Sequence, residues 1–200
     1  MIKSQIHGIF QTPIYRTTLT QDLSKKQLSF INKVKKEKNP GEGGNTVSCN
    51  MNILDEGILK NIKQELNLII EDYFERIISP SNDMTPYITQ SWLNYTEANQ
   101  MHHIHAHSNS YVSGVLYINC HEKLDRIKFY KGEHNVIQPS IKESNLYNTN
   151  NWWFPVNTKD VIMFPSSLNH GVDPKQGNNT RISLSFNVFV KGTLGAYTSA

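Results

Sequence analysis

Cysteine is scarce in this 200-residue chain, which contains only Cys49 and Cys120. Two cysteines are too few for a disulfide framework, and they do not match a cysteine-rich zinc module. We therefore expect reduced thiols and a cytoplasmic location. Long apolar runs are missing as well, because no stretch approaches the roughly 20 apolar residues that a membrane-spanning helix needs. This predicts a soluble, unprocessed protein with no membrane partner.

The chain also lacks a strong excess of either charge. Its 20 Lys and Arg residues against 17 Asp and Glu residues give a net charge of +3. The basic residues are scattered and do not alternate with aromatic residues in a way that would follow a phosphate backbone. We therefore expect no nucleic-acid partner. The sequence indicates neither a substrate nor an oligomeric state.

The first part of the chain has helical patterns. An apolar run at residues 9–15 predicts a short strand, and residues 19–39 show apolar side chains at near-helical spacing. The stretch NPGEGGN at residues 39–45 ends that pattern with proline and glycine. A stronger 3.6-residue pattern over residues 55–78 predicts a second helix.

The rest of the chain consists of short β-branched and aromatic runs between turn signals. These runs lie at residues 87–96, 111–120, 126–132, 160–165 and 181–192. Two helices followed by many strands favour a mainly β jelly-roll barrel or sandwich with the helices on its outer face. We expect one domain over residues 1–200, with a strand and helical support in 1–80 and the β core in 85–192.

Histidines are concentrated in HHIHAH at residues 102–107, which holds four of the eight histidines in the chain. Alternate side chains of an extended strand share a face. His103, His105 and His107 are therefore expected on one face, and His102 on the other. An H-x-H pair exists in two registers, and either pair offers two imidazole ligands for a metal ion.

A third ligand would have to come from a distant strand. His170 is the candidate, because it follows an apolar strand and lies among turn-forming residues. The alternative is that surface histidines cluster here by chance, or bind metals adventitiously with no chemistry.

Arg181 and Ser183 lie two apart in RISLSFNVFV, on one face of an otherwise apolar strand. A buried arginine needs a partner, since an unpaired buried charge costs roughly 3–5 kcal/mol. Its planar guanidinium suits a carboxylate. That carboxylate is either Asp160 or Asp173 of this chain, or it belongs to a ligand.

Together, H-x-H, an apolar strand, a distant histidine and R-x-S resemble the Fe(II)- and 2-oxoglutarate-dependent oxygenases. The pattern is most similar to a group of 2OG-Fe(II) oxygenases in which H-x-H precedes an SG-containing strand. The matching stretches are SWLNY, HAHSNSYVSGVLYIN, VIMFPSSLNHGV and RISLSFNV, and the opening GIFQTPIY is similar to the start of that group. The resemblance implies a double-stranded β-helix of the cupin-like class. In this reading, a single oxygenase domain binds Fe(II) and 2-oxoglutarate inside one end.

The resemblance also implies roles for individual residues. The metal ligands it implies are His105, His107 and His170. The residues it places around 2-oxoglutarate are Arg181 and Tyr117 on the C5 carboxylate, Ser183 beside them, and Asn94.

One position departs from the superfamily. Most members have an acidic residue where this chain has His107, completing a face of two histidines and one carboxylate. Three neutral imidazoles leave the full +2 charge on the ion, which should strengthen binding of anionic 2-oxoglutarate and admit nickel, copper or zinc. Two alternatives stay open: a carboxylate from Glu97 or Asp125 completes the site, or His103 and His105 form the pair.

The implied activity is hydroxylation of an unidentified substrate, with O2 consumed and succinate and CO2 released. Two other functions fit the same residues. One is a cupin-like three-histidine metal enzyme that does not use 2-oxoglutarate. The other is a non-catalytic jelly-roll binding module with a structural ion, which would have a closed four-coordinate site.

Overall fold

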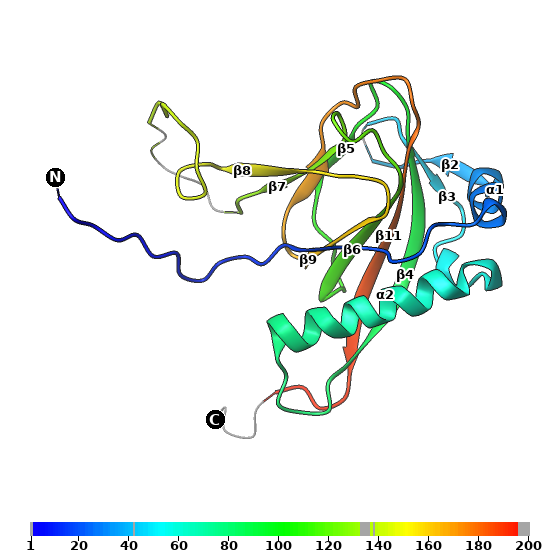
Figure 1. The fold of residues 1–200 in the computed structure, drawn as a ribbon, viewed down its shortest axis with the longest axis horizontal. Helices are drawn as coiled ribbons and strands as arrows, with labels where there is room; N and C mark the ends of the chain where they lie inside the picture. Colours follow the sequence, from blue (N-terminus) through cyan, green and yellow to red (C-terminus); the bar gives the residue numbers. More distant parts are fainter. Residues whose placement is uncertain (1, 42, 133–136, 138, 196–200) are drawn as a thin grey trace.

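The computed structural model describes residues 2–41, 43–132, 137 and 139–195. Two antiparallel sheets form the body of the protein (Figure 1). The larger sheet has the strand order β1-β9-β6-β11-β4-β3-β2, and the smaller has the order β5-β10-β7-β8. This mainly β, double-stranded arrangement with two N-terminal helices is the jelly roll that was predicted.

The elements have the following bounds. The strands are β1 Tyr15–Thr18, β2 Lys36–Lys38, β3 Thr46–Ser48, β4 Thr85–Thr96, β5 His102–His105, β6 Val112–Asn119, β7 Arg126–Tyr130, β8 Asn151–Pro155, β9 Asp160–Pro165, β10 His170–Val172 and β11 Arg181–Lys191. The helices are α1 Lys25–Lys33 and α2 Lys60–Tyr73; short helical turns, Ile53–Asp55 and Gly57–Leu59, precede α2, and the turn Phe74–Ile78 follows it.

Helix α1 is shorter than the predicted helix over residues 19–39. It begins at a capping box, in which the Ser24 hydroxyl accepts the Gln27 N–H and the Gln27 side chain accepts the Ser24 N–H. It ends at Lys33, and β2 then pairs with β3. Pairing with a neighbouring strand therefore overrides the local helical pattern of this stretch.

The predicted strand at residues 9–15 is also displaced. Strand β1 starts only at Tyr15, where it pairs with β9, and residues 2–14 form an arm that projects from the body (Figure 1). Ile9 and Phe10 of this arm are 73% and 97% exposed. An apolar run alone does not make a strand, because a strand also needs a neighbouring strand with which it pairs.

Helix α2 covers the outer face of the larger sheet. Ile62, Leu66 and Ile70 recur every four residues on one side of the helix and are all buried. They join a core that includes Leu93 and Leu184 from the sheet. Each side chain buried in this way contributes roughly 1.5–3 kcal/mol. A second, smaller apolar cluster, with Phe129 and Phe164 among its members, draws on strands of both sheets.

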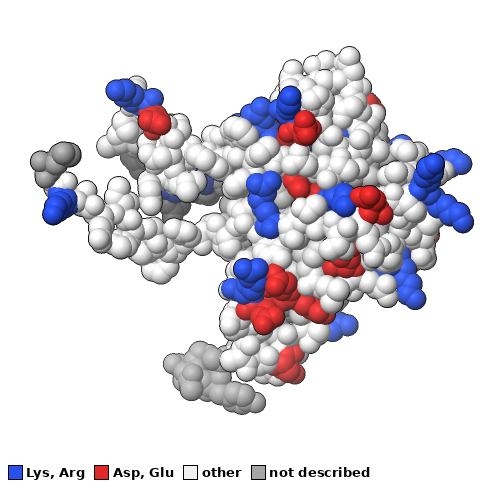
Figure 2. All heavy atoms as spheres, in the orientation of Figure 1, with Lys and Arg blue, Asp and Glu red and all other residues white. Residues whose placement is uncertain are grey.

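Acidic and basic side chains are mixed over the face shown in Figure 2, and the projecting region at its left is mostly uncharged. Within the described ranges, no helix combines the length and the apolar character needed to cross a bilayer.

Candidate metal centre

Three histidines from two strands and a loop meet on the smaller sheet. His105 of β5 lies directly opposite His170 of β10, and their ring centroids are 4.4 Å apart. His107 lies just beyond β5, with its ring centroid 5.0 Å from that of His105 and 5.2 Å from that of His170. One potential ligand nitrogen from each ring lies within 4.8 Å of the others. We call His105, His107 and His170 the inner triad.

Backbone carbonyls fix two of these rings. Nδ1 of His105 lies 2.9 Å from the carbonyl oxygen of His103, and Nδ1 of His170 lies 2.9 Å from that of Leu168. A carbonyl only accepts, so each Nδ1 carries the proton and each Nε2 keeps its lone pair. This partner arrangement is the usual one for histidines that bind a metal through Nε2.

The inner triad is electrically neutral near pH 7. Burial and, to a smaller extent, the neighbouring His105 lower the pKa of His107 to about 4 and that of His170 to about 3. Burial also lowers the pKa of His105. Metal binding requires unprotonated imidazole, so these rings need not lose a proton before they bind an ion.

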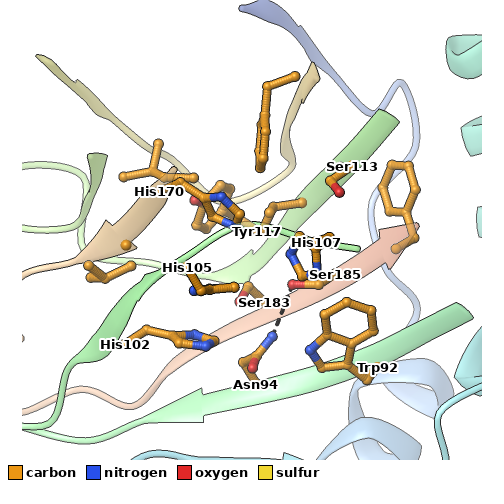
Figure 3. A pocket seen from close by; sticks show the side chains of 17 residues that line it. Trp92, Asn94, His102, His105, His107, Ser113, Tyr117, His170, Ser183 and Ser185 are labelled. Atoms are coloured by element: carbon orange, nitrogen blue, oxygen red, sulfur yellow. Dashed lines mark hydrogen bonds between the residues drawn. The ribbon is translucent and has the colours of Figure 1, made fainter. Parts of the chain in front are cut away.

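A row of polar residues on the larger sheet faces the triad. Ser183 of β11 is paired with Asn94 on one side and with Tyr117 on the other. All three line the same cavity of about 40 Å³ as the inner triad (Figure 3). The amide of Asn94 donates to Ser185 (3.0 Å), while its buried Oδ1 has no hydrogen-bond partner. Burial raises the pKa of Tyr117, so its hydroxyl stays protonated and can donate to an anion.

Arg181 lies next to this cavity, not in its wall. It lines an adjoining cavity of about 290 Å³, and Val172 is common to both. Only 4% of Arg181 is exposed; one guanidinium nitrogen donates to Thr96 (3.2 Å), and its Nε has no partner.

Neither aspartate considered as a partner of Arg181 pairs with it. Asp160 lies 3.6 Å from Arg16, and Asp173 lies 3.5 Å from Lys128. The part of the chain that the structure describes therefore gives Arg181 no carboxylate, although such a buried charge requires a counter-ion or ligand.

His102 occupies a place that strand alternation does not predict. It lines the cavity together with His105, and the two rings stack with centroids 4.6 Å apart. The pairing of β5 with β10 shifts register between His170 and Val172, so the four residues 102–105 of β5 lie opposite the three residues 170–172 of β10. Such a bulge reverses the alternation of side chains, which is why the expected opposite orientation of His102 was wrong.

The structure brings neither proposed carboxylate to the histidines. Glu97 is exposed and accepts a hydrogen bond from Thr180, and Asp125 accepts one from the His121 N–H and lines the adjoining cavity. The groups of three close metal-binding side chains found among the described residues contain histidines only.

A serine network, which the sequence did not single out, holds the loop that carries His107. The His107 N–H donates to the carbonyl of Ser166 (2.9 Å), and the Ser166 hydroxyl donates to Ser110 (2.8 Å). The hydroxyls of Ser113 and Ser166 lie 2.8 Å apart, and Ser113 also donates to Asn187 (3.0 Å). These contacts fix His107 although it follows the end of a strand.

Trp152 extends the row of His105 and His170 across the smaller sheet. Phe129 is paired with His170 on one side and with Trp152 on the other, so all four side chains share a face. Trp152 is 37% exposed and lines a groove of about 570 Å³ between β8 and the N-terminal arm.

The segment that contains this site is similar to a known protein family. Residues 90–187 match the family described as "Putative 2OG-Fe(II) oxygenase". That segment begins before β4 ends and runs into β11, so it contains the inner triad and the Asn94, Ser183 and Tyr117 row. None of the curated proteins is similar to the chain in sequence.

Several solved structures share the fold. A Pseudomonas putida prolyl-4-hydroxylase has 11% identity and a TM-score of 0.59, with 88% of this chain and 92% of that chain covered. A 2OG-Fe(II) oxygenase family oxidoreductase from Burkholderia pseudomallei has 13% identity and a TM-score of 0.57, covering 86% and 84%. HygX from Streptomyces hygroscopicus, solved with nickel, 2-oxoglutarate and hygromycin B, has 13% identity and a TM-score of 0.58, covering 88% and 82%.

Proposed function

We propose that this chain, whose residues 90–187 match the family described as "Putative 2OG-Fe(II) oxygenase", hydroxylates a substrate with Fe(II), 2-oxoglutarate and O2. The proposed metal ligands are His105, His107 and His170. The proposed cosubstrate residues are Arg181, Ser183, Tyr117 and Asn94. One observation carries the proposal: three neutral imidazoles converge beside a buried guanidinium that has no carboxylate partner among the described residues.

The donor set suits a divalent transition metal. Imidazole is a good ligand for iron, nickel, copper and zinc, and three of them on one face leave the other positions of an octahedron open. A structural ion would need a closed set of four ligands. The inner triad supplies three and lines a cavity, which favours a catalytic site over a binding module.

When bound, iron and 2-oxoglutarate supply the chemistry, in which O2-dependent decarboxylation to succinate and CO2 accompanies hydroxylation of a substrate C–H bond. The chain's part is to bind and orient the reactants. Arg181 would hold the far carboxylate of 2-oxoglutarate with charge-assisted hydrogen bonds, and the protonated Tyr117 hydroxyl would donate to the same anion.

Substrate would be selected at the edge of the smaller sheet. Trp152 presents an exposed indole on the face that carries His105 and His170, two strands away from His170. At a strand spacing of about 4.8 Å, Trp152 lies roughly 10 Å from His170. An aromatic wall at this distance favours a substrate with an apolar or ring-containing part.

Anaerobic titration of the iron-loaded protein with 2-oxoglutarate tests the proposal. We expect a weak visible absorption band as the keto acid chelates iron. Arg181→Ala should raise the dissociation constant of 2-oxoglutarate by about 10- to 100-fold without changing metal content, because charged hydrogen bonds contribute roughly 1.5–3 kcal/mol. Arg76→Ala, at an exposed site on the turn after α2, is the control and should match the parent.

The alternative enzyme uses three histidines without 2-oxoglutarate. It predicts no such band, and Arg181 would then bind the carboxylate of the substrate itself. A parent protein that binds iron yet gives no band at saturating 2-oxoglutarate would favour this alternative. An unchanged affinity of Arg181→Ala for 2-oxoglutarate would show that Arg181 does not hold the far carboxylate of 2-oxoglutarate.

A further inference from the structure

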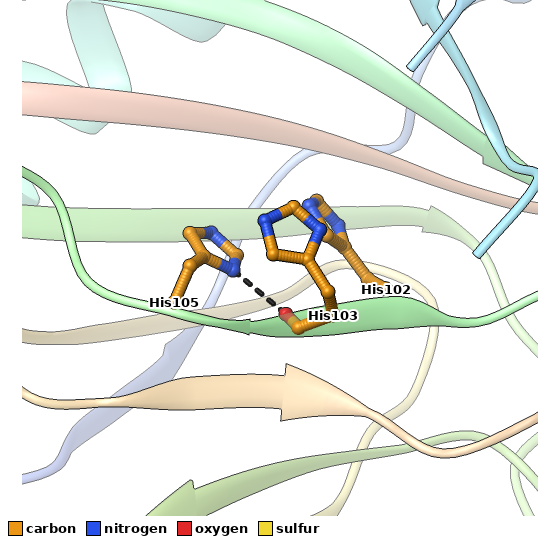
Figure 4. Close-up of side chains that lie close together, drawn as sticks. All are labelled: His102, His103 and His105. Carbon is orange, nitrogen blue, oxygen red and sulfur yellow. Dashed lines mark hydrogen bonds between the residues drawn. The ribbon is translucent and has the colours of Figure 1, made fainter. Parts of the chain in front are cut away.

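A second group of three histidines lies beside the inner triad. His102, His103 and His105 each offer a ligand nitrogen, and these nitrogens lie within 4.8 Å of one another. Their ring centroids are 4.6 to 5.2 Å apart, and the three rings project together from β5 (Figure 4). We call this group the outer triad. It is distinct from the inner triad except for His105.

The loop after β2 holds the outer triad in place. Asn39 is buried; its amide nitrogen lies 3.5 Å from Nε2 of His102, and its Oδ1 accepts the Gly41 N–H (3.0 Å). Gly41 packs so closely on His103 that a Cβ there would lie 2.1 Å from the ring. Only glycine permits this approach, and as a result the His103 ring lies beside His102.

One ring nitrogen of the outer triad lacks a hydrogen-bond partner. Nδ1 of His103 is buried and makes no hydrogen bond. A cation bound among the three imidazoles would give this nitrogen the partner that it lacks. The residue type and the spacing suit zinc, copper or nickel.

The two triads compete for His105. Its Nδ1 is engaged by the carbonyl of His103, so Nε2 is its one free nitrogen. A ring nitrogen has a single lone pair and binds a single ion. A metal in the outer triad therefore removes His105 from the inner one.

We infer that His102, His103 and His105 form a second transition-metal site, and that its occupation by zinc, copper or nickel excludes a metal ion from full coordination by the inner triad. This inference goes beyond the proposed function. It gives the chain a site through which a competing metal ion would switch off iron binding.

Zinc titration in competition with a chromophoric chelator tests the inference without iron, 2-oxoglutarate or O2. The parent should bind one zinc ion per chain. His170→Ala removes the inner triad and His103→Ala removes the outer one, so each variant should still bind one ion within about tenfold of the parent affinity. The double variant lacks a ligand of each triad, so its zinc affinity should fall by more than the roughly 10- to 100-fold that losing the hydrogen-bond partner of a metal ligand costs.

Further variants separate ligand loss from misfolding. His107→Ala also disables the inner triad and should behave like His170→Ala, alone and combined with His103→Ala. His105→Ala should lose affinity as the double variant does, since both triads need it. Circular dichroism and thermal unfolding of each variant establish that it is folded.

Two results would overturn the inference. If His170→Ala and His107→Ala, both folded, lose zinc as completely as the double variants, the outer triad binds no ion. If the parent binds two zinc ions, the sites do not exclude each other. Because only zinc is measured, either result leaves the proposed oxygenase function standing, and failure of the 2-oxoglutarate titration leaves the outer site standing.

Discussion

His105 and His170 face each other across the pairing of β5 with β10, with ring centroids 4.4 Å apart. Nδ1 of each ring is directed to a backbone carbonyl at 2.9 Å, so that Nε2 of both is free. This pair is the rigid part of the inner triad, because strand pairing and the two hydrogen bonds both fix it. His107 reaches the same point from a loop that serines hold.

His170→Ala should abolish the visible band that 2-oxoglutarate gives with the iron-loaded protein. The reason is that iron would lose the ligand contributed by β10 and no longer be held by the inner triad. Anaerobic absorption spectroscopy measures this directly. His121→Ala, at an exposed histidine after β6, serves as the control and should keep the band. A band of parental intensity in His170→Ala would remove His170 from the metal site.

His107→Asp should keep iron but weaken 2-oxoglutarate binding. A carboxylate at this position offsets part of the +2 charge that attracts the anion. His107→Asn has nearly the same size without the charge, so the ratio of the two dissociation constants isolates the electrostatic effect. Anaerobic titration provides both constants. Tighter binding in His107→Asp than in His107→Asn would contradict this explanation.

The metal-free protein should lose stability as the pH falls below about 6.5, the usual pKa of histidine in an unfolded chain. Burial lowers the pKa of His107 to about 4 and that of His170 to about 3 in the folded protein. The unfolded chain therefore binds more protons over this range, and the stabilising contribution of neutral histidines, complete above pH 6.5, declines toward pH 4 and below.

Urea unfolding in the presence of a chelator at pH 7.5, 6.0 and 5.0 measures this dependence. His170→Gln cannot take up a proton at that position, so its stability should change less between pH 7.5 and 5.0 than that of the parent. Equal slopes in the two proteins would show that His170 does not resist protonation.

Gly114→Ala should destabilise the fold by about 1–3 kcal/mol, the usual range for overpacking a core. A Cβ at Gly114 would lie 2.1 Å from the ring of Phe186, which is fully buried and also lines the cavity. Gly132→Ala is the matched control, since nothing lies within 4 Å of its added Cβ. Denaturant unfolding compares the two. Equal stabilities would mean that Phe186 moves aside without cost.

The sequence predicted the strands of the core well. The run at residues 160–165 is β9, and the two-residue spacing of Arg181 and Ser183 puts both on the inward side of β11. These strands are apolar and buried on both faces, so their local pattern and their tertiary environment agree.

Other features depend on pairing that no local pattern encodes. The register shift in β5 turns His102 toward the cavity, and the displaced β1 depends on the position of the β9 edge. The serine network has no sequence signature either, because Ser110, Ser113 and Ser166 meet only after β6 and β9 have paired. The orientation of His102, the position of β1 and the serine network therefore all depend on contacts between residues that are distant in sequence.

An anaerobic crystal structure of the protein with Fe(II) and 2-oxoglutarate tests the central claim most directly. We predict one ion bound by Nε2 of His105, His107 and His170, with the far carboxylate of 2-oxoglutarate on Arg181. An ion that lacks any of these three nitrogens, or a 2-oxoglutarate molecule whose far carboxylate lies away from Arg181, would contradict the claim.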